Sequence, residues 1–159
     1  MGKRTLVLGL GNPILTDDGV GVRVAQAVKA LLPQELEVDV QEVSLGGLTL
    51  MESMLGYDHV ILIDAIQLPG RWPGEVRRLS LDDLSTIAPT QHSASPHDAN
   101  LPTALAAGRQ LGMALPEEVV ILAIQVENVM DFSENLTPAV AAAIPIAIEM
   151  VMAELGISE

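Results

Sequence analysis

The hydrophobic positions of the chain follow two periods that alternate from one segment to the next. Continuous apolar runs are typical of strands covered on both faces, and alternation of apolar and polar residues is typical of strands with one exposed face. Apolar residues every three to four positions are typical of helices. The strands predicted in this way are Thr5–Gly11, Leu36–Val43, His59–Ile66, Glu75–Leu81 (an antiparallel edge) and Glu118–Val126. The predicted helices are Val20–Leu31, Leu48–Leu55, Leu101–Leu111 and a last one from Pro138 to about Leu155, capped by Thr137 and kinked at Pro145.

Alternation of strands and helices predicts an α/β fold. We expect a single-domain, doubly wound, mostly parallel sheet of about five strands flanked by helices. No repeat or linker interrupts residues 1–159, so one domain over the whole chain is expected. The polar segment Asp83–Asn100 has little periodicity and is interpreted as a functional loop.

The charge balance narrows the classes of partner. The chain has 21 acidic and 8 basic residues and a formal net charge of −13. Such an excess of acids disfavours nucleic acids and anionic membranes, whose recognition needs basic residues. The chain has no cysteine, which excludes disulfides and a cysteine nucleophile. The short apolar run after Lys3 and Arg4 predicts a first strand and not a signal peptide, so a cytoplasmic location is expected.

Three polar positions fall where an α/β sheet binds ligands, outside the carboxyl ends of its strands. Asp17 and Asp18 follow the first strand, Asp64 lies near the end of a buried strand, and His97 precedes a helix. If the strands are parallel, these residues meet at one edge. Two carboxylates and an imidazole suit a borderline divalent metal and leave coordination positions open.

Each of these residues also has a purely structural interpretation. An acid at a helix start interacts favourably with the helix dipole, a strand-end Asp is commonly hydrogen-bonded, and a lone loop His commonly lies on the surface. Asp64 is the hardest to explain in this way, because burying an unpaired carboxylate is costly. Convergence at one edge favours the metal interpretation.

Known catalytic motifs are missing from the sequence. It has no Gly-x-Ser-x-Gly elbow, no His-Glu-x-x-His and no Gly-x-x-x-x-Gly-Lys. Gly9-Leu-Gly11 supplies two of the three glycines of a dinucleotide-binding turn, but Ile14 stands at the third. A nucleotide-binding, Rossmann-like domain is therefore a weaker alternative hypothesis.

Four segments carry a resemblance to a known family, the NiFe-hydrogenase maturation endopeptidases. They are Gly9-Leu-Gly-Asn-Pro-Ile-Leu-Thr-Asp-Asp-Gly-Val-Gly21, Ile61-Leu-Ile-Asp-Ala-Ile66, Ser95-Pro-His97 with Leu101 following, and Leu136-Thr-Pro138. The resemblance implies that Asp18, Asp64 and His97 form the metal-binding and catalytic site, and that Asp17 is a helix-start acid. It also implies an endopeptidase that removes the C-terminal extension of a hydrogenase large-subunit precursor. The metal would be nickel carried by that substrate, used as a recognition handle, with no resident cofactor.

Two departures from the family pattern stand out. Many members have an Asp-Gly-Gly turn after the second strand, whereas this chain has Ser44-Leu45-Gly46-Gly47, with Glu52 as a candidate substitute for the acid. The segment Ala123-Ile-Gln-Val-Glu-Asn128 lacks the proline common in relatives. These departures keep open a second hypothesis, a non-catalytic assembly factor that binds the nickel-loaded precursor. The residue that activates water also stays open.

Overall fold

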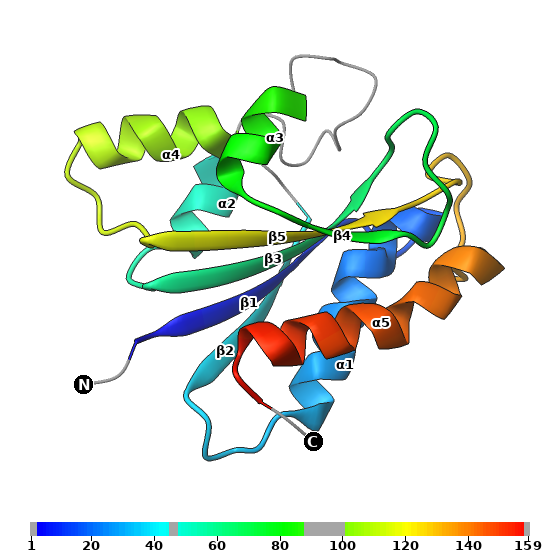
Figure 1. Ribbon diagram of the computed structural model, residues 1–159, viewed down its shortest axis with the longest axis horizontal. Helices are drawn as coiled ribbons and strands as arrows, with labels where there is room; N and C mark the ends of the chain where they lie inside the picture. Colours follow the sequence, from blue (N-terminus) through cyan, green and yellow to red (C-terminus); the bar gives the residue numbers. More distant parts are fainter. Residues whose placement is uncertain (1–2, 45–47, 88–100, 158–159) are drawn as a thin grey trace.

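The computed structural model describes residues 3–44, 48–87 and 101–157, which form one five-stranded sheet in the order β2-β1-β3-β5-β4. The strands are β1 (Thr5–Leu10), β2 (Val38–Val43), β3 (His59–Ile66), β4 (Val76–Leu79) and β5 (Glu118–Gln125). Neighbouring strands are parallel except β4, which runs antiparallel to β5 at the edge. In Figure 1 helices cover both faces, so the predicted α/β class and sheet are confirmed.

The two helical layers follow from the alternation of side chains along the strands. The first layer holds α1 (Val20–Leu31) and α5 (Pro138–Glu154); the second holds α2 (Leu48–Ser53), α3 (Leu81–Ile87) and α4 (Leu101–Gln110). Leu6, Leu8 and Leu10 of β1 face the second layer, and Val7 faces the first. Both faces of the sheet are thus buried, which explains the continuous apolar runs. In the part of the chain described here, no helix has the length and apolar character needed to span a membrane.

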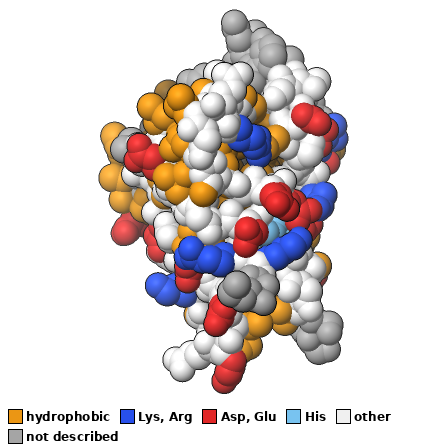
Figure 2. Space-filling view, turned by 90° about the vertical axis from the view of Figure 1, so that its left-hand side faces the viewer, with side chains coloured by type: hydrophobic (Ala, Val, Ile, Leu, Met, Phe, Trp, Pro, Cys, Tyr) orange, Lys and Arg blue, Asp and Glu red, His pale blue; other side chains and the backbone are white. Residues whose placement is uncertain are grey.

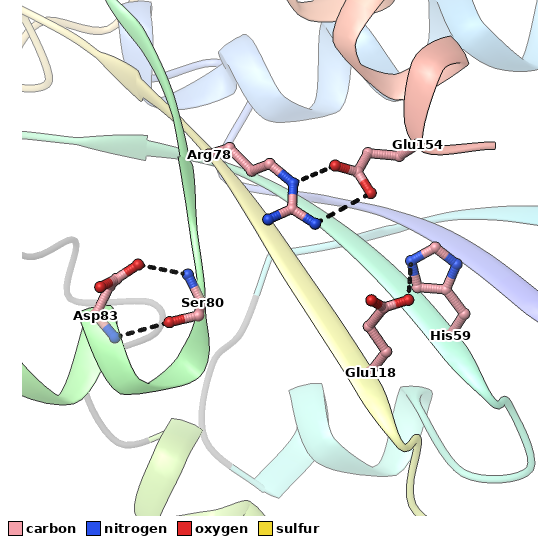
Figure 3. Close-up of polar contacts among 6 residues, drawn as sticks. All are labelled: His59, Arg78, Ser80, Asp83, Glu118 and Glu154. Atoms are coloured by element: carbon pink, nitrogen blue, oxygen red, sulfur yellow. Dashed lines mark hydrogen bonds and ion pairs between the residues drawn. The ribbon is translucent and has the colours of Figure 1, made fainter. Parts of the chain in front are cut away.

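The loop predicted for Asp83–Asn100 is wrong in its first part. Leu81–Ile87 is a helix, α3, and only residues 88–100 of the expected loop lie outside the described residues. At its start the Asp83 carboxylate accepts a hydrogen bond from the Ser80 backbone N–H, and the Ser80 hydroxyl accepts one from the Asp83 N–H (Figure 3). Hydrogen bonding of the carboxylate by Ser80, chiefly from its backbone N–H, lowers the pKa of the Asp83 carboxyl group. This reciprocal capping ends the edge strand and begins the helix.

The edge strand β4 is tied to the last helix by a charged pair. Figure 3 shows the guanidinium group of Arg78 on β4 pointing toward the carboxylate of Glu154 near the end of α5. The pair joins the ends of two elements that lie far apart in the sequence. It holds α5 against the antiparallel edge.

Glycines allow the first helix to lie unusually close to the sheet. A Cβ atom on Gly21 would lie 2.3 Å from the Ile63 carbonyl oxygen of β3 and 2.7 Å from that of Leu10 in β1. A Cβ atom on Gly9 would lie 2.6 Å from the Gly21 carbonyl oxygen. The start of α1 therefore contacts the backbone of two strands directly, at the end of the sheet where the candidate acids lie.

We predict that Gly21→Ala destabilises the protein by at least about 2 kcal/mol, because its methyl group meets backbone carbonyl groups that cannot move aside. Gly108→Ala in α4 is the matched control. There the added Cβ meets only the ends of the Leu115, Met51 and Met113 side chains. Unfolding in urea, followed by circular dichroism, measures the free energy of unfolding of both variants. Equal stability of the two variants would contradict this account of the helix–sheet contact.

Candidate functional site

Three connections gather at the carboxyl ends of the parallel strands, at the right of Figure 1. They are the turn from β1 through the short 3-10 helix η1 (Thr16–Gly19), the loop from β3 to β4, and the loop from β5 to α5. Asp17 and Asp18 lie in η1, and Asp64 lies in β3 near its carboxyl end. The parallel sheet thus places these acids at one edge, as the sequence predicts.

Asp18 is buried in the first turn and held by the backbone. Its side chain is only slightly exposed, 6%, and its Oδ2 accepts a hydrogen bond of 2.8 Å from the Asn12 N–H. The turn closes tightly because Gly11 has a positive φ of 143°, and a Cβ atom there would lie 2.0 Å from the Asp18 carbonyl oxygen. Only glycine permits this approach.

Asp64 is buried more completely, with 1% of its surface exposed. Its Oδ1 accepts a hydrogen bond of 2.8 Å from the N–H of the next residue, Ala65. The short helix η1 packs against β3, so Asp18 and Asp64 belong to elements in direct contact. Two carboxylates with little access to water are therefore placed on adjoining elements at the mouth of the sheet.

The third candidate ligand, His97, lies outside the described residues, as does most of the Ser44–Gly47 turn. Among residues 3–44, 48–87 and 101–157 no three His, Cys, Asp or Glu side chains form a group able to hold a metal ion. The ligand set of Asp18, Asp64 and His97 therefore stays a prediction. Two carboxylates and an imidazole remain suitable donors for a borderline divalent ion.

The carboxylate of Asp17 has a role that sequence reasoning missed. The residue is fully buried, 0% exposed, and does not cap its own helix. Its Oδ1 and Oδ2 accept hydrogen bonds from the Thr137 hydroxyl, and Oδ1 accepts a further one of 2.8 Å from the Thr137 N–H. The N–H groups of Glu127 and Asn128 donate to Oδ2 at 3.2 and 3.0 Å. Asp17 thus joins the first turn to the β5–α5 loop and to the start of α5.

Backbone hydrogen bonds continue this connection along the same loop. The Thr16 N–H donates to the Ser133 carbonyl oxygen, and the Ser133 N–H donates to that of Ile14, both at 2.9 Å. Thr16 has a positive φ of 47°, which is uncommon for a β-branched residue, and its hydroxyl donates to the Asp131 carbonyl oxygen. Strain of this kind persists where surrounding contacts fix the backbone. We call residues 14–18, which carry Asp17 and Asp18, the acid turn. These contacts attach the acid turn to residues 127–133.

Glu52, the candidate substitute for the missing turn acid, lies elsewhere. It is exposed on α2 and lines a shallow groove between α2 and α4 together with Met51, Thr103 and Ala107. The structure places it with these residues and not beside the buried acids of the first turn. Its proposed role as a substitute stays a prediction.

Comparison with known proteins identifies the family. The model of the family "Hydrogenase maturation protease" matches residues 22–154, most of the chain. The chain belongs to the hydrogenase maturation protease family. As a member it is a peptidase.

Relatives and solved structures agree with this assignment. The hydrogenase 2 maturation protease of Escherichia coli (strain K12) is 34% identical over 154 residues, which are 96% of this chain and 90% of that protein. The structure of the hydrogenase maturating endopeptidase HybD from E. coli superposes with a TM-score of 0.80 and 32% identity, covering 96% of this chain and 91% of the other. A hydrogenase 2 maturation peptidase from a Thaumarchaeota archaeon gives 0.67 and 29%, covering 98% and 100%. The resemblance seen in the sequence is confirmed.

We predict that Asp17→Asn lowers the free energy of unfolding of this protease by roughly 2–4 kcal/mol, because the amide presents N–H donors to backbone N–H groups that need an acceptor. Asp131→Asn is the matched control. That residue lies exposed in the same loop and accepts one bond, 2.9 Å from the Asn128 amide. Chemical denaturation measures the free energy of unfolding of both variants. An Asp17→Asn protein as stable as the Asp131→Asn control would contradict the role of Asp17 in joining the first turn to the β5–α5 loop.

Proposed function

We propose that this protease removes the C-terminal extension of a NiFe-hydrogenase large-subunit precursor after nickel has been inserted. Asp18, Asp64 and His97 would engage the substrate's nickel, which acts as the recognition handle that positions the scissile bond. The observation that carries the proposal is the pair of buried carboxylates, Asp18 and Asp64, on adjoining elements at the carboxyl edge.

The chemistry of this edge supports recognition of a cation. Two carboxylates withdrawn from water at one edge are suited to bind a divalent cation, whose charge offsets theirs. Backbone N–H groups orient both carboxylates in advance, so little reorganisation is needed when a cation arrives. A borderline ion such as nickel accepts carboxylate and imidazole ligands.

Hydrolysis requires that a water oxygen attack the peptide carbonyl carbon, that the C–N bond break, and that the leaving amine gain a proton. The sequence has no cysteine to form a covalent intermediate and no serine elbow. Water is then activated either by polarisation on the substrate's metal or by a carboxylate acting as general base. The buried acids of the edge are the residues placed for the second route.

The altered turn at Ser44–Gly47 supports a second candidate, an assembly factor that binds the nickel-loaded precursor without cleaving it. The turn has no carboxylate where many relatives have one. Mass spectrometry of a mixture of this protein and the nickel-loaded precursor distinguishes the two candidate functions. Release of a C-terminal peptide supports the protease, and a stable complex with an intact precursor supports the assembly factor.

We predict that Asp64→Asn and His97→Ala each reduce precursor cleavage at least about 100-fold while leaving the fold intact, because each removes a group that engages the metal. Asp58→Asn is the matched control for the first variant. Asp58 is exposed at the opposite edge, where its carboxylate accepts a bond from the Arg4 N–H. Cleavage is followed by gel shift of the large subunit. Undiminished cleavage by either site variant would remove that residue from the site.

We also predict that precursor prepared without nickel resists cleavage, because the proposed handle is missing. Adding nickel through the cell's maturation machinery and repeating the assay should restore cleavage by the same enzyme sample. Equal rates on the nickel-free and nickel-loaded precursors would overturn recognition through the metal and leave only the peptidase assignment.

A further inference from the structure

Three large apolar side chains lie exposed beside the acid turn. Met130 and Phe132 in the β5–α5 loop are 83% and 82% exposed, and Ile14 in the first turn is 50% exposed. Ile14 and Phe132 are close in space, because Ser133 pairs with Leu15 and its N–H donates to the Ile14 carbonyl oxygen. We call Ile14, Met130 and Phe132 the edge patch.

The edge patch is attached to the candidate site through the backbone. Residues 14–16 bond to residue 133, and the Asp17 carboxylate holds residues 127 and 128. Whatever binds the patch is therefore held in a fixed position relative to Asp18, the next residue along the turn.

The use of aromatic residues supports a binding role. The chain has only three, one Trp, one Tyr and one Phe. Tyr57 is buried, but Phe132 and Trp72 are exposed. Trp72 belongs to the β3–β4 loop, and that loop lies at the same carboxyl edge (Figure 1). Aromatic residues and methionine are enriched in protein–protein interfaces and are costly to expose without a partner.

The opposite edge of the sheet has a different character. Figure 2 looks onto the amino ends of the strands and shows acidic and basic side chains mixed together below an apolar area. At this edge the His59 Nε2 atom lies 3.3 Å from the Glu118 carboxylate (Figure 3). Both signs of charge are thus mixed at the amino edge, whereas the loop that carries Met130 and Phe132 has acids beside them.

Those acids indicate the charge of the partner. Glu127, Asp131 and Glu134 lie exposed in the same loop as Met130 and Phe132, and the chain as a whole carries a net charge of −13. A complementary surface is apolar at its centre and rich in Lys and Arg around it. A second copy of this chain, with the same acids, would be repelled.

We propose that the edge patch is the docking surface for the folded body of the protein substrate, an apolar area bordered by basic residues, distinct from the segment that is cleaved. The proposal rests on the proposed function, since it takes the substrate to be a folded precursor and not a free peptide. Docking here orients the precursor before its metal and scissile segment meet the buried acids.

The test compares Met130→Ser/Phe132→Ser with wild type in cleavage of the nickel-loaded large-subunit precursor. We expect KM to rise about tenfold with kcat little changed, since these side chains contribute binding and no chemistry. Leu111→Ser is the matched control, an equally apolar residue 80% exposed after α4, on the way to the amino end of β5. It should leave KM unchanged.

Binding of nickel-free precursor is measured in parallel by biolayer interferometry, so that docking is read without cleavage. Weaker binding of the double variant supports docking even if no precursor is ever cleaved, in which case only the proposed function fails. An unchanged KM and unchanged binding overturn the docking surface. The docking surface is also overturned if analytical ultracentrifugation shows that the wild-type protein is a dimer and the double variant a monomer. The edge patch would then bind a second copy of this chain.

Discussion

The hydrogen bonds accepted by the buried Asp17 carboxylate are the interaction on which the carboxyl edge depends. After β5 the chain must turn back so that α5 can lie beside α1 on the same face of the sheet. The turn brings together the N–H groups of residues 127, 128 and 137, and one carboxylate accepts bonds from all three and from the Thr137 hydroxyl. A buried charge is tolerated only with such bonding. The function of Asp17 is therefore architectural, and it fixes the position of its neighbour Asp18.

Much of this architecture was predictable because it depends on local pattern. The runs Thr5–Gly11 and His59–Ile66 are apolar almost without interruption, since both faces of these strands are covered, and parallel strands bring their carboxyl ends to one edge. The joint placement of Asp18 and Asp64 follows from that topology alone. Their orientation by Asn12 and Ala65 does not, because it depends on the backbone of the folded turn.

Contacts between distant residues were not predictable. Thr137 before Pro138 has the sequence of an ordinary N-cap, but its hydroxyl bonds to a carboxylate 120 positions away and makes no cap bond. Neither hydrophobic period nor spacing carries that information. The start of α3 was missed for a different reason: Asp83 was interpreted as the first residue of a polar loop, although a Ser followed by an acid three positions later is a helix-start signal.

The acid turn and the edge patch share one hydrogen-bonded framework, and this has consequences for catalysis. Residues 14–17 and 127–133 are joined by direct hydrogen bonds, so a protein bound at Phe132 would be positioned relative to Asp18 through these bonds. Under the proposed function, binding energy gained away from the reacting bond would then be available to orient the substrate's metal and scissile segment. A peptidase that acts on one folded precursor, as proposed, would gain selectivity from this arrangement. A short peptide that lacks the docking surface would reach the acids with no such orientation, and a folded protein without the metal would lack the proposed handle.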